Sequence, residues 1–248
     1  MARRLFLSGT ARAGTSALVN ILNLHNHIMM GQERYFLKFR RNEIRQAHFE
    51  KERFLDLRAG DTHEHGGLHG LPPGQRARRF DRAVYIGDKF PPLFRHLEHV
   101  MAEFPDARHI YLLRNPLSVV ESYEARFQNP DDNWTLDWRA GLDAWNDSVA
   151  RISELPAEAL RQFLFVQYED IYSSPAAINA LFTRLGLSNL EPETLLPFTE
   201  KFSTLNTKMV PRRDDIRVHI ARHANWGAYQ NLCRLMAGQE QQAASNRP

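Results

Sequence analysis

The chain has 248 residues, of which 43% are apolar and 25% are charged, close to the proportions of an average globular protein. These values exclude a wholly disordered chain, a collagen-like fibre and a disulfide-stapled miniprotein, and no apolar run is long enough to span a bilayer. A formal net charge of +3 is too small to indicate nucleic-acid binding. The only cysteine, Cys233, cannot form an internal disulfide, so we expect a cytoplasmic protein.

Short apolar runs alternate with helical patterns along the chain. The runs that predict buried strands are residues 5–7, 28–30, 83–86, 109–113 and 163–166. Helical patterns follow at 18–22, from Pro91 or Pro92, after Pro116, over 134–152 and over 175–185. This alternation predicts an α/β fold of three layers, in which helices flank a central parallel sheet. We expect a single domain over residues 1–238 and a polar tail over 239–248.

Residues 59–79 interrupt the alternation with five glycines, two prolines and three histidines. We expect a long loop or lid here, because loops of this length in compact domains are usually functional or disordered. Its histidines, His63, His65 and His69, could in principle bind zinc. The run has no cysteine and no rigid helical spacing, so no metal is expected.

The most informative segment is the loop Ser8-Gly9-Thr10-Ala11-Arg12-Ala13-Gly14-Thr15-Ser16, which follows the first strand and opens the first helix. Its glycines allow backbone N–H groups to approach a phosphate, and the helix start adds N–H donors and a positive dipole end. Thr15 and Ser16 add hydroxyl donors, and the fold is therefore expected to be P-loop-like. A nucleotide triphosphatase P-loop has lysine where Thr15 stands, whereas the cation of this loop is Arg12. The alternative is an ordinary strand–helix turn with a surface arginine.

Two later strands end in residues suited to the same ligand. Arg114 follows the strand at 109–113, at the sheet edge where open α/β sheets bind ligands, and its planar fork can grip a phosphate. Ser122 lies eight residues later on the next helix and could face the same ligand. The alternative places Arg114 in a surface ion pair and Ser122 in water. Tyr168-Glu169-Asp170 ends the strand at 163–166, where the two carboxylates could merely cap a helix.

Together, the loop, the Arg114–Ser122 pair and Tyr168-Glu169-Asp170 resemble the sulfotransferases that use 3′-phosphoadenosine 5′-phosphosulfate (PAPS). The resemblance covers roughly residues 3–186. It implies that Arg12, Ala13, Gly14, Thr15 and Ser16 bind the 5′-phosphosulfate, with Arg12 stabilising the bridging oxygen. It also implies that Arg114 and Ser122 bind the 3′-phosphate and that Tyr168 lies near the adenine. The family usually has lysine where this chain has Arg12.

Glu33 and Lys89 resemble catalytic residues of glycosaminoglycan sulfotransferases. There, a glutamate followed by aromatic residues is the base, as in Glu33-Arg34-Tyr35-Phe36, and a Lys-x-Pro lysine lies by the sulfuryl group, as in Lys89-Phe90-Pro91. The alternatives are that Glu33 is a surface carboxylate paired with Arg34 and that Lys89 is a solvated charge at a strand end. A histidine of the 59–79 segment could replace Glu33 as the base.

The implied reaction transfers a sulfuryl group to a hydroxyl or amine, with a small molecule or carbohydrate as acceptor. Residues 59–79 and 129–138 could shape the acceptor pocket, where Trp134 and Trp138 could stack on the acceptor or simply pack their helix. One competing function is a P-loop kinase that uses ATP and magnesium, with Asp88 and Ser16 as ligands of the metal. Another is a module that binds a phosphorylated nucleotide and catalyses no reaction. The oligomeric state cannot be inferred from the sequence.

Overall fold

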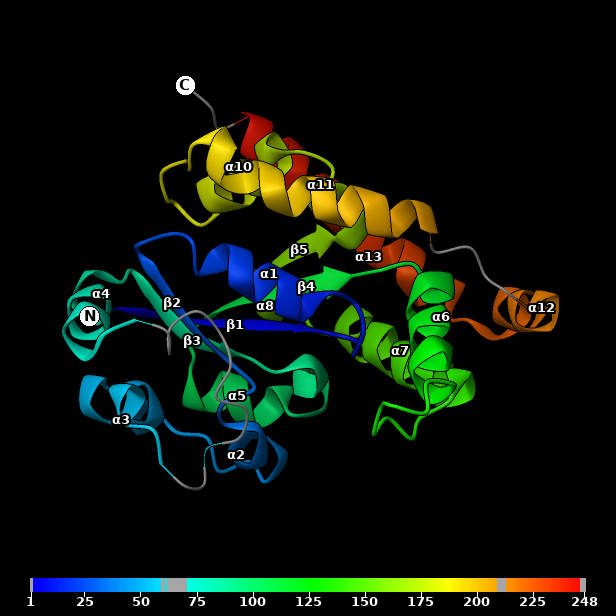
Figure 1. The fold of residues 1–248 in the computed structure, drawn as a ribbon, viewed down its shortest axis with the longest axis horizontal. Coiled ribbons are helices and arrows are strands. Elements are labelled where there is room, and N and C mark those ends of the chain that lie inside the picture. Colours follow the sequence, from blue (N-terminus) through cyan, green and yellow to red (C-terminus); the bar gives the residue numbers. More distant parts are fainter. Residues whose placement is uncertain (1, 59–60, 62–70, 209–212, 246–248) are drawn as a thin grey trace. The chain divides into compact units, whose positions relative to one another are not determined.

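The computed structural model describes residues 2–58, 61, 71–208 and 213–245, and its elements can be followed by colour in Figure 1. The chain forms two compact units. The first, here the N-terminal unit, comprises Met1–Gly9, Gly14–Tyr111 and Glu158–Phe163. The second, here the C-terminal unit, comprises Thr10–Ala13, Leu112–Ala157 and Leu164–Pro248.

The strands form one five-stranded parallel sheet with the order β2-β3-β1-β4-β5. They are β1 (Arg3–Gly9), β2 (Ile28–Gln32), β3 (Tyr85–Lys89), β4 (Arg108–Leu113) and β5 (Phe163–Gln167). All five predicted strands are confirmed, as is the α/β fold with helices flanking the sheet. Leu5, Phe6 and Leu7 are consecutive buried residues, the pattern of a parallel strand that is covered on both faces.

The register of the sheet brings three strand ends together. Lys89 of β3 pairs with Leu7 of β1 on one side and with Gln32 of β2 on the other. The segments that leave β1 and β2 therefore start beside the end of β3. Because the carboxyl ends of parallel strands are where such sheets bind ligands, this register selects one edge for the site.

An aromatic cluster centred on Phe6 fills the core of the N-terminal unit. The rings of Phe39, Phe49 and Phe104 lie 5.9, 5.6 and 5.1 Å from it, all in edge-on arrangements. Such edge-to-face pairs contribute beyond the apolar area that they bury. Phe6 is fully buried, so the cluster anchors β1 and with it the start of the loop that follows.

The helices of the N-terminal unit surround this core. They are α1 (Thr15–Leu22), α2 (Phe36–Arg40), η1 (Gln46–Phe49), α3 (Lys51–Leu55), α4 (Pro73–Arg82), η2 (Pro91–Arg95) and α5 (Leu97–Glu103), where η denotes a 3₁₀ helix. α4 corrects the sequence prediction, which extended a loop to residue 79. The glycines and prolines concentrate before residue 75, whereas Gln75 to Arg82 are mostly good helix formers behind a proline in the first turn.

Three helices of the C-terminal unit begin at polar residues whose side chains cap the helix. Asn115, Asp137 and Ser174 accept hydrogen bonds from backbone N–H groups of the first turns of α6 (Pro116–Phe127), α7 (Trp138–Ser153) and α10 (Pro175–Arg184). The cap at Asp137 explains why α7 starts at Trp138, where the sequence pattern predicted a start at 134. The other helices of this unit are α9 (Tyr168–Ile171), α11 (Pro192–Lys208), α12 (Asp214–His223) and α13 (Trp226–Ser245). The short helix α8 (Ala157–Leu160) begins in this unit at Ala157 and otherwise belongs to the N-terminal unit.

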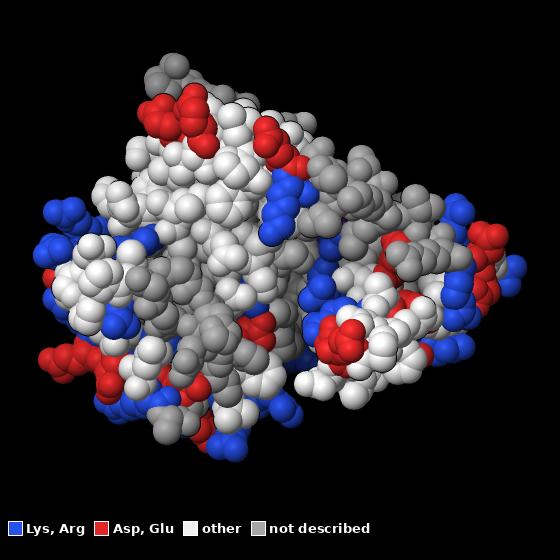
Figure 2. Space-filling model, viewed as in Figure 1, with Lys and Arg blue, Asp and Glu red and all other residues white. Residues whose placement is uncertain are grey.

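Two general properties bear on partners. Among the described residues, no helix is long and apolar enough to cross a membrane. Acidic and basic side chains are interspersed on the face drawn in Figure 2, in line with the small net charge. The single-domain prediction for residues 1–238 stays a prediction, and α13 continues through residue 245 of the predicted tail.

Candidate functional site

The loop of residues 8–16, here called the phosphate loop, enters α1 through a glycine in the left-handed region. Gly14 has φ of +98° and stands at the N-cap of α1, a conformation that favours glycine because other residues carry a Cβ. Because glycine has no side chain, the N-cap residue itself offers no side-chain cap to this helix. The first N–H groups of a helix and the positive end of its dipole suit an anionic ligand, so anion binding at the start of α1 stays a prediction.

Lys89, Glu33 and Ser16 form a polar cluster at the shared end of β1, β2 and β3. The ammonium of Lys89 makes an ion pair with the Glu33 carboxylate, and its Nζ donates a hydrogen bond to Ser16 Oγ at 3.1 Å. The Lys89 side chain is 1% exposed and that of Glu33 is 24% exposed. Lys89 is therefore not a solvated strand-end charge, and the Glu33 carboxylate remains accessible from one side.

The Arg34 side chain has partners in a later segment of the chain. Its guanidinium makes an ion pair of 3.1 Å with Asp61 and donates to the backbone carbonyls of Arg53, Phe54 and Asp56. The ion pair of Glu33 with Lys89 gives this carboxylate a buried partner on a neighbouring strand. The sequence could not identify the partners of Arg34 and Glu33, because both are distant along the chain. Arg34 bonds to Phe54, 20 positions later, and Glu33 pairs with Lys89, 56 positions later.

Asp88, the metal ligand expected for a kinase, is inside the protein. It is 0% exposed, and its two carboxylate oxygens accept hydrogen bonds from the backbone N–H groups of Arg34, Tyr35 and Lys89. Burial raises the pKa of this carboxyl to about 7, while the N–H donors and the charge of Lys89 act in the opposite direction. A carboxylate enclosed in this way is not accessible to a magnesium ion. Asp88 therefore does not suit the role of metal ligand that the kinase alternative requires.

A second cluster lies in the C-terminal unit, around Arg12. This residue has φ of +68°, and its Nε donates a hydrogen bond to Ser122 Oγ at 3.1 Å. Desolvation lowers the pKa of Arg12, and the positive charges of Arg126 and Arg114 lower it further. The Asp132 carboxylate acts in the opposite direction. Because two other arginines lie close enough to Arg12 to affect its charge, an anion bound here would be stabilised.

Arg114 is held on several sides. Its guanidinium carbon lies 3.9 Å from the centre of the Tyr168 ring, and its Nη1 donates to the Arg12 carbonyl at 2.8 Å. Trp145 donates its indole N–H to the Arg114 carbonyl at 2.9 Å. Arg114 is 5% exposed and Tyr168 4% exposed, so neither is a solvated strand-end residue. The stacking of Tyr168 on Arg114 is a contact that the sequence analysis did not anticipate.

Arg126 belongs to this cluster although the sequence analysis omitted it. It lies four residues after Ser122 on α6, the spacing that puts two side chains on one face of a helix. Its guanidinium lies 4.5 Å from the Trp134 ring and is paired with Asp132. The four-residue spacing from Ser122 is the feature of the sequence that could have identified Arg126 as a member of the cluster. Trp134 thus stacks on an arginine, while Trp138 is 4% exposed and packs against His219.

The remaining predicted residues divide into those that the structure describes and those that it does not. Thr15 is buried, and the Ala13 N–H donates to the Thr10 carbonyl at 2.9 Å, within the turn of the loop. His63, His65 and His69 lie outside the described residues. In the described part of the chain, no three His, Cys, Asp or Glu side chains are grouped so that they could hold a metal ion.

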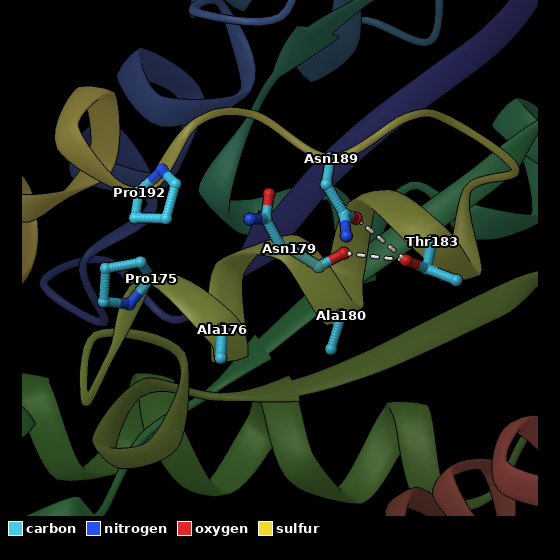
Figure 3. Close-up of a pocket in the computed structure, with 7 residues that line it drawn as sticks. All are labelled: Pro175, Ala176, Asn179, Ala180, Thr183, Asn189 and Pro192. Atoms are coloured by element: carbon cyan, nitrogen blue, oxygen red, sulfur yellow. Dashed lines mark hydrogen bonds between the residues drawn. The ribbon is translucent and has the colours of Figure 1, made fainter.

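A separate cavity of about 510 Å³ lies between α10 and the start of α11 (Figure 3). It is lined by Pro175, Ala176, Asn179, Ala180, Thr183, Asn189 and Pro192. Its polar groups bond mainly to one another, since Thr183 donates to the Asn179 carbonyl or to Asn189 Oδ1, and Asn179 bonds to the Leu190 backbone. With no titratable or nucleophilic group in its lining beyond a hydroxyl, this cavity is not a candidate active site.

Comparison with solved structures shows the same fold in sulfotransferases. A sulfotransferase from Alicyclobacillus acidocaldarius has 18% identity and a TM-score of 0.55, with 96% of each chain covered. A sulfotransferase domain from the curacin biosynthetic pathway has 18% identity and a TM-score of 0.50, with 78% of this chain and 76% of that chain covered.

The sequence itself carries the family assignment. No curated protein matches the chain at a significant level. A profile of the sulfotransferase family matches residues 4–192, which include the phosphate loop, Glu33, Lys89, Arg114 and Tyr168. Because this match covers more than half of the chain, the protein belongs to the sulfotransferase family.

Proposed function

We propose that this protein transfers the sulfuryl group of PAPS to a hydroxyl or amine of a small-molecule or carbohydrate acceptor. The observation that carries the proposal is the cluster of Lys89, Glu33 and Ser16 at the end of the parallel strands, beside the start of α1. It combines a buried cation, an accessible carboxylate and a hydroxyl at a helix N-terminus. Family membership supports sulfotransfer, and nothing in the comparisons favours a kinase.

The donor would bind through its two anionic ends. The N–H groups at the start of α1 suit the 5′-phosphosulfate, and the cluster of Arg12, Arg114 and Ser122 suits the 3′-phosphate. The loop that contributes Arg12 continues directly into Gly14, so one segment supplies groups to both ends. This proposal differs from the sequence prediction in one respect. Because Arg12 bonds to Ser122, we assign its guanidinium to the 3′-phosphate end.

The reaction would be an in-line displacement at sulfur. The acceptor oxygen or nitrogen forms a bond to sulfur while the bond from sulfur to the bridging oxygen breaks, and adenosine 3′,5′-bisphosphate leaves. Glu33 takes the acceptor proton, and Lys89 stabilises the negative charge that develops on the bridging oxygen. Burial of Lys89 strengthens that stabilisation, because charge interactions are stronger where water is excluded.

Ligand-induced stabilisation tests the donor assignment. Thermal unfolding is followed with adenosine 3′,5′-bisphosphate and, separately, with ATP and magnesium. The bisphosphate at a hundred times its dissociation constant should add about 2.7 kcal/mol of stability, because it binds the folded state only. We expect a clear shift with the bisphosphate and little shift with ATP; the reverse result would contradict the proposal.

Substitution of Glu33 tests the proposed base. Glu33→Gln should keep bisphosphate affinity and lose roughly 10²- to 10⁴-fold in sulfuryl transfer, the usual contribution of a general base. Transfer is measured from labelled PAPS to a panel of phenols, alcohols and amino sugars. Glu43→Gln is the matched control, since Glu43 makes an exposed ion pair with Lys38. Wild-type turnover in Glu33→Gln would remove Glu33 from the mechanism.

A further inference from the structure

Asp88 is a buried carboxylate to which the proposed reaction assigns no role. It is the fourth residue of β3, next to Lys89, and none of its surface is exposed. Oδ1 accepts hydrogen bonds from the N–H groups of Lys89 at 2.9 Å and Arg34 at 3.3 Å, and Oδ2 accepts one from Tyr35 at 3.0 Å. Both oxygens are thus directed at backbone donors, and two of these donors belong to the turn that carries Glu33.

That turn requires an external support, because Glu33 has φ of +58°. The left-handed region is unfavourable for a residue with a Cβ, so the surrounding structure must hold it there. The turn is closed by a hydrogen bond of 3.2 Å from the Phe36 N–H to the Glu33 carbonyl. The Glu33 N–H donates to the Lys89 carbonyl at 2.8 Å, and the next two N–H groups both donate to Asp88. Three successive backbone groups are therefore tied to the end of β3.

A glycine leaves room for this arrangement. A Cβ added to Gly31 would lie 2.8 Å from Asp88 Oδ1 and 3.3 Å from its Cγ, closer than side chains tolerate. The carboxylate therefore occupies space that any other residue at position 31 would fill. Gly31 on β2 and Asp88 on β3 are paired in the register of the sheet, so the fit is part of the strand pairing itself.

We propose that Asp88 is a positioning residue, which fixes the turn at residues 33–35 so that the Glu33 carboxylate meets the Lys89 ammonium. This inference rests on the proposed function, in which Glu33 is the base. Asp88 cannot itself be the base, because its oxygens are enclosed and already accept backbone hydrogen bonds. It acts on the reaction only through the backbone that carries Glu33.

Asp88→Asn tests the proposal in a kinetic double-mutant cycle with Glu33→Gln. The amide is isosteric but replaces one acceptor oxygen by an NH2 donor. This donor faces a backbone N–H group, to which it cannot bond, so the turn shifts. We expect kcat to fall between about tenfold and a hundredfold, as for misplacement of a reacting group by about 1 Å. The dissociation constant of adenosine 3′,5′-bisphosphate should stay within about twofold. Asp81→Asn is the control, since Asp81 makes an exposed ion pair with Lys51.

The cycle separates positioning from a general loss of structure. In the Glu33→Gln background, Asp88→Asn should lower kcat by no more than about twofold, because no base remains to be misplaced. Independent, multiplicative losses would overturn the proposal, as would an unchanged kcat in Asp88→Asn. Gly31→Ala, which crowds the same carboxyl group without changing its chemistry, should reproduce the kcat loss if Asp88→Asn does not fold.

A crystal structure of Asp88→Asn, or of Gly31→Ala if the first does not fold, gives a readout that needs no activity. We expect the turn at residues 33–35 to be displaced and the ion pair of Glu33 with Lys89 to be broken. An unchanged turn would overturn the positioning role. If the wild-type protein shows no sulfuryl transfer but the variant displaces the turn, the proposed function fails while the positioning of Glu33 by Asp88 stands.

Discussion

His109 on β4 makes the stability of the fold sensitive to acid. It is 0% exposed and stacks on Phe163, with ring centres 4.8 Å apart and an angle of 20° between the ring planes. Neither ring nitrogen has a hydrogen-bond partner among the described residues. Burial lowers the pKa of His109 to about 3, because a charged imidazolium would lose its hydration there.

The magnitude follows from proton linkage. In the unfolded chain His109 has a pKa of about 6.5, so between pH 6.5 and about 3 the unfolded state binds a proton that the folded state does not. Stability is therefore unaffected above pH 6.5 and falls as the pH drops, by about 1.4 kcal/mol per pH unit. At pH 5 the loss from this one residue is about 2 kcal/mol, the product of that slope and 1.5 pH units.

Urea denaturation at pH 7.5 and pH 5.0 measures this effect in the wild type and in His109→Phe. The phenyl ring keeps the stacking and cannot bind a proton, and any packing cost is the same at both pH values. We expect the wild type to lose about 2 kcal/mol more than His109→Phe between the two pH values. His27→Gln, which replaces an exposed histidine, is the control. Equal pH dependence in the wild type and in His109→Phe would refute the reasoning.

Two further predictions concern single contacts. Tyr168→Leu should weaken the binding free energy of adenosine 3′,5′-bisphosphate by about 1–2 kcal/mol, because it removes the ring on which Arg114 stacks. Tyr168→Phe keeps the ring and should bind nearly as the wild type does. Titration calorimetry measures both, and equal affinities in the two variants would contradict the role of the ring. Gly87→Ala should destabilise the fold by about 3 kcal/mol or more, because its Cβ would lie 1.6 Å from the Leu5 carbonyl oxygen. Gly74→Ala, where a Cβ meets nothing within 4 Å, should be neutral or stabilising in urea denaturation, and similar effects of the two alanines would contradict the packing argument.

The sequence by itself determined the features that depend on neighbouring residues. Apolar runs and their spacing predicted every strand of the sheet, because burial on both faces leaves a continuous hydrophobic pattern. The glycine spacing of the loop before α1 predicted an anion-binding helix start, and Gly14 has the left-handed conformation that this requires. Family resemblance added Glu33 and Lys89 as a pair, although neither their distance nor their partners could be derived from local patterns.

Only the tertiary structure decided which of these residues meet. Glu33 pairs with Lys89 because β2 lies next to β3 in the sheet order. Arg12 bonds to Ser122 across 110 positions, and Asp88 turns inward to support a turn 53 positions earlier. Such contacts depend on strand order, register and burial, which are properties of the closed fold. Local sequence patterns predict helices and strands from neighbouring residues, so they do not specify which distant residues come into contact.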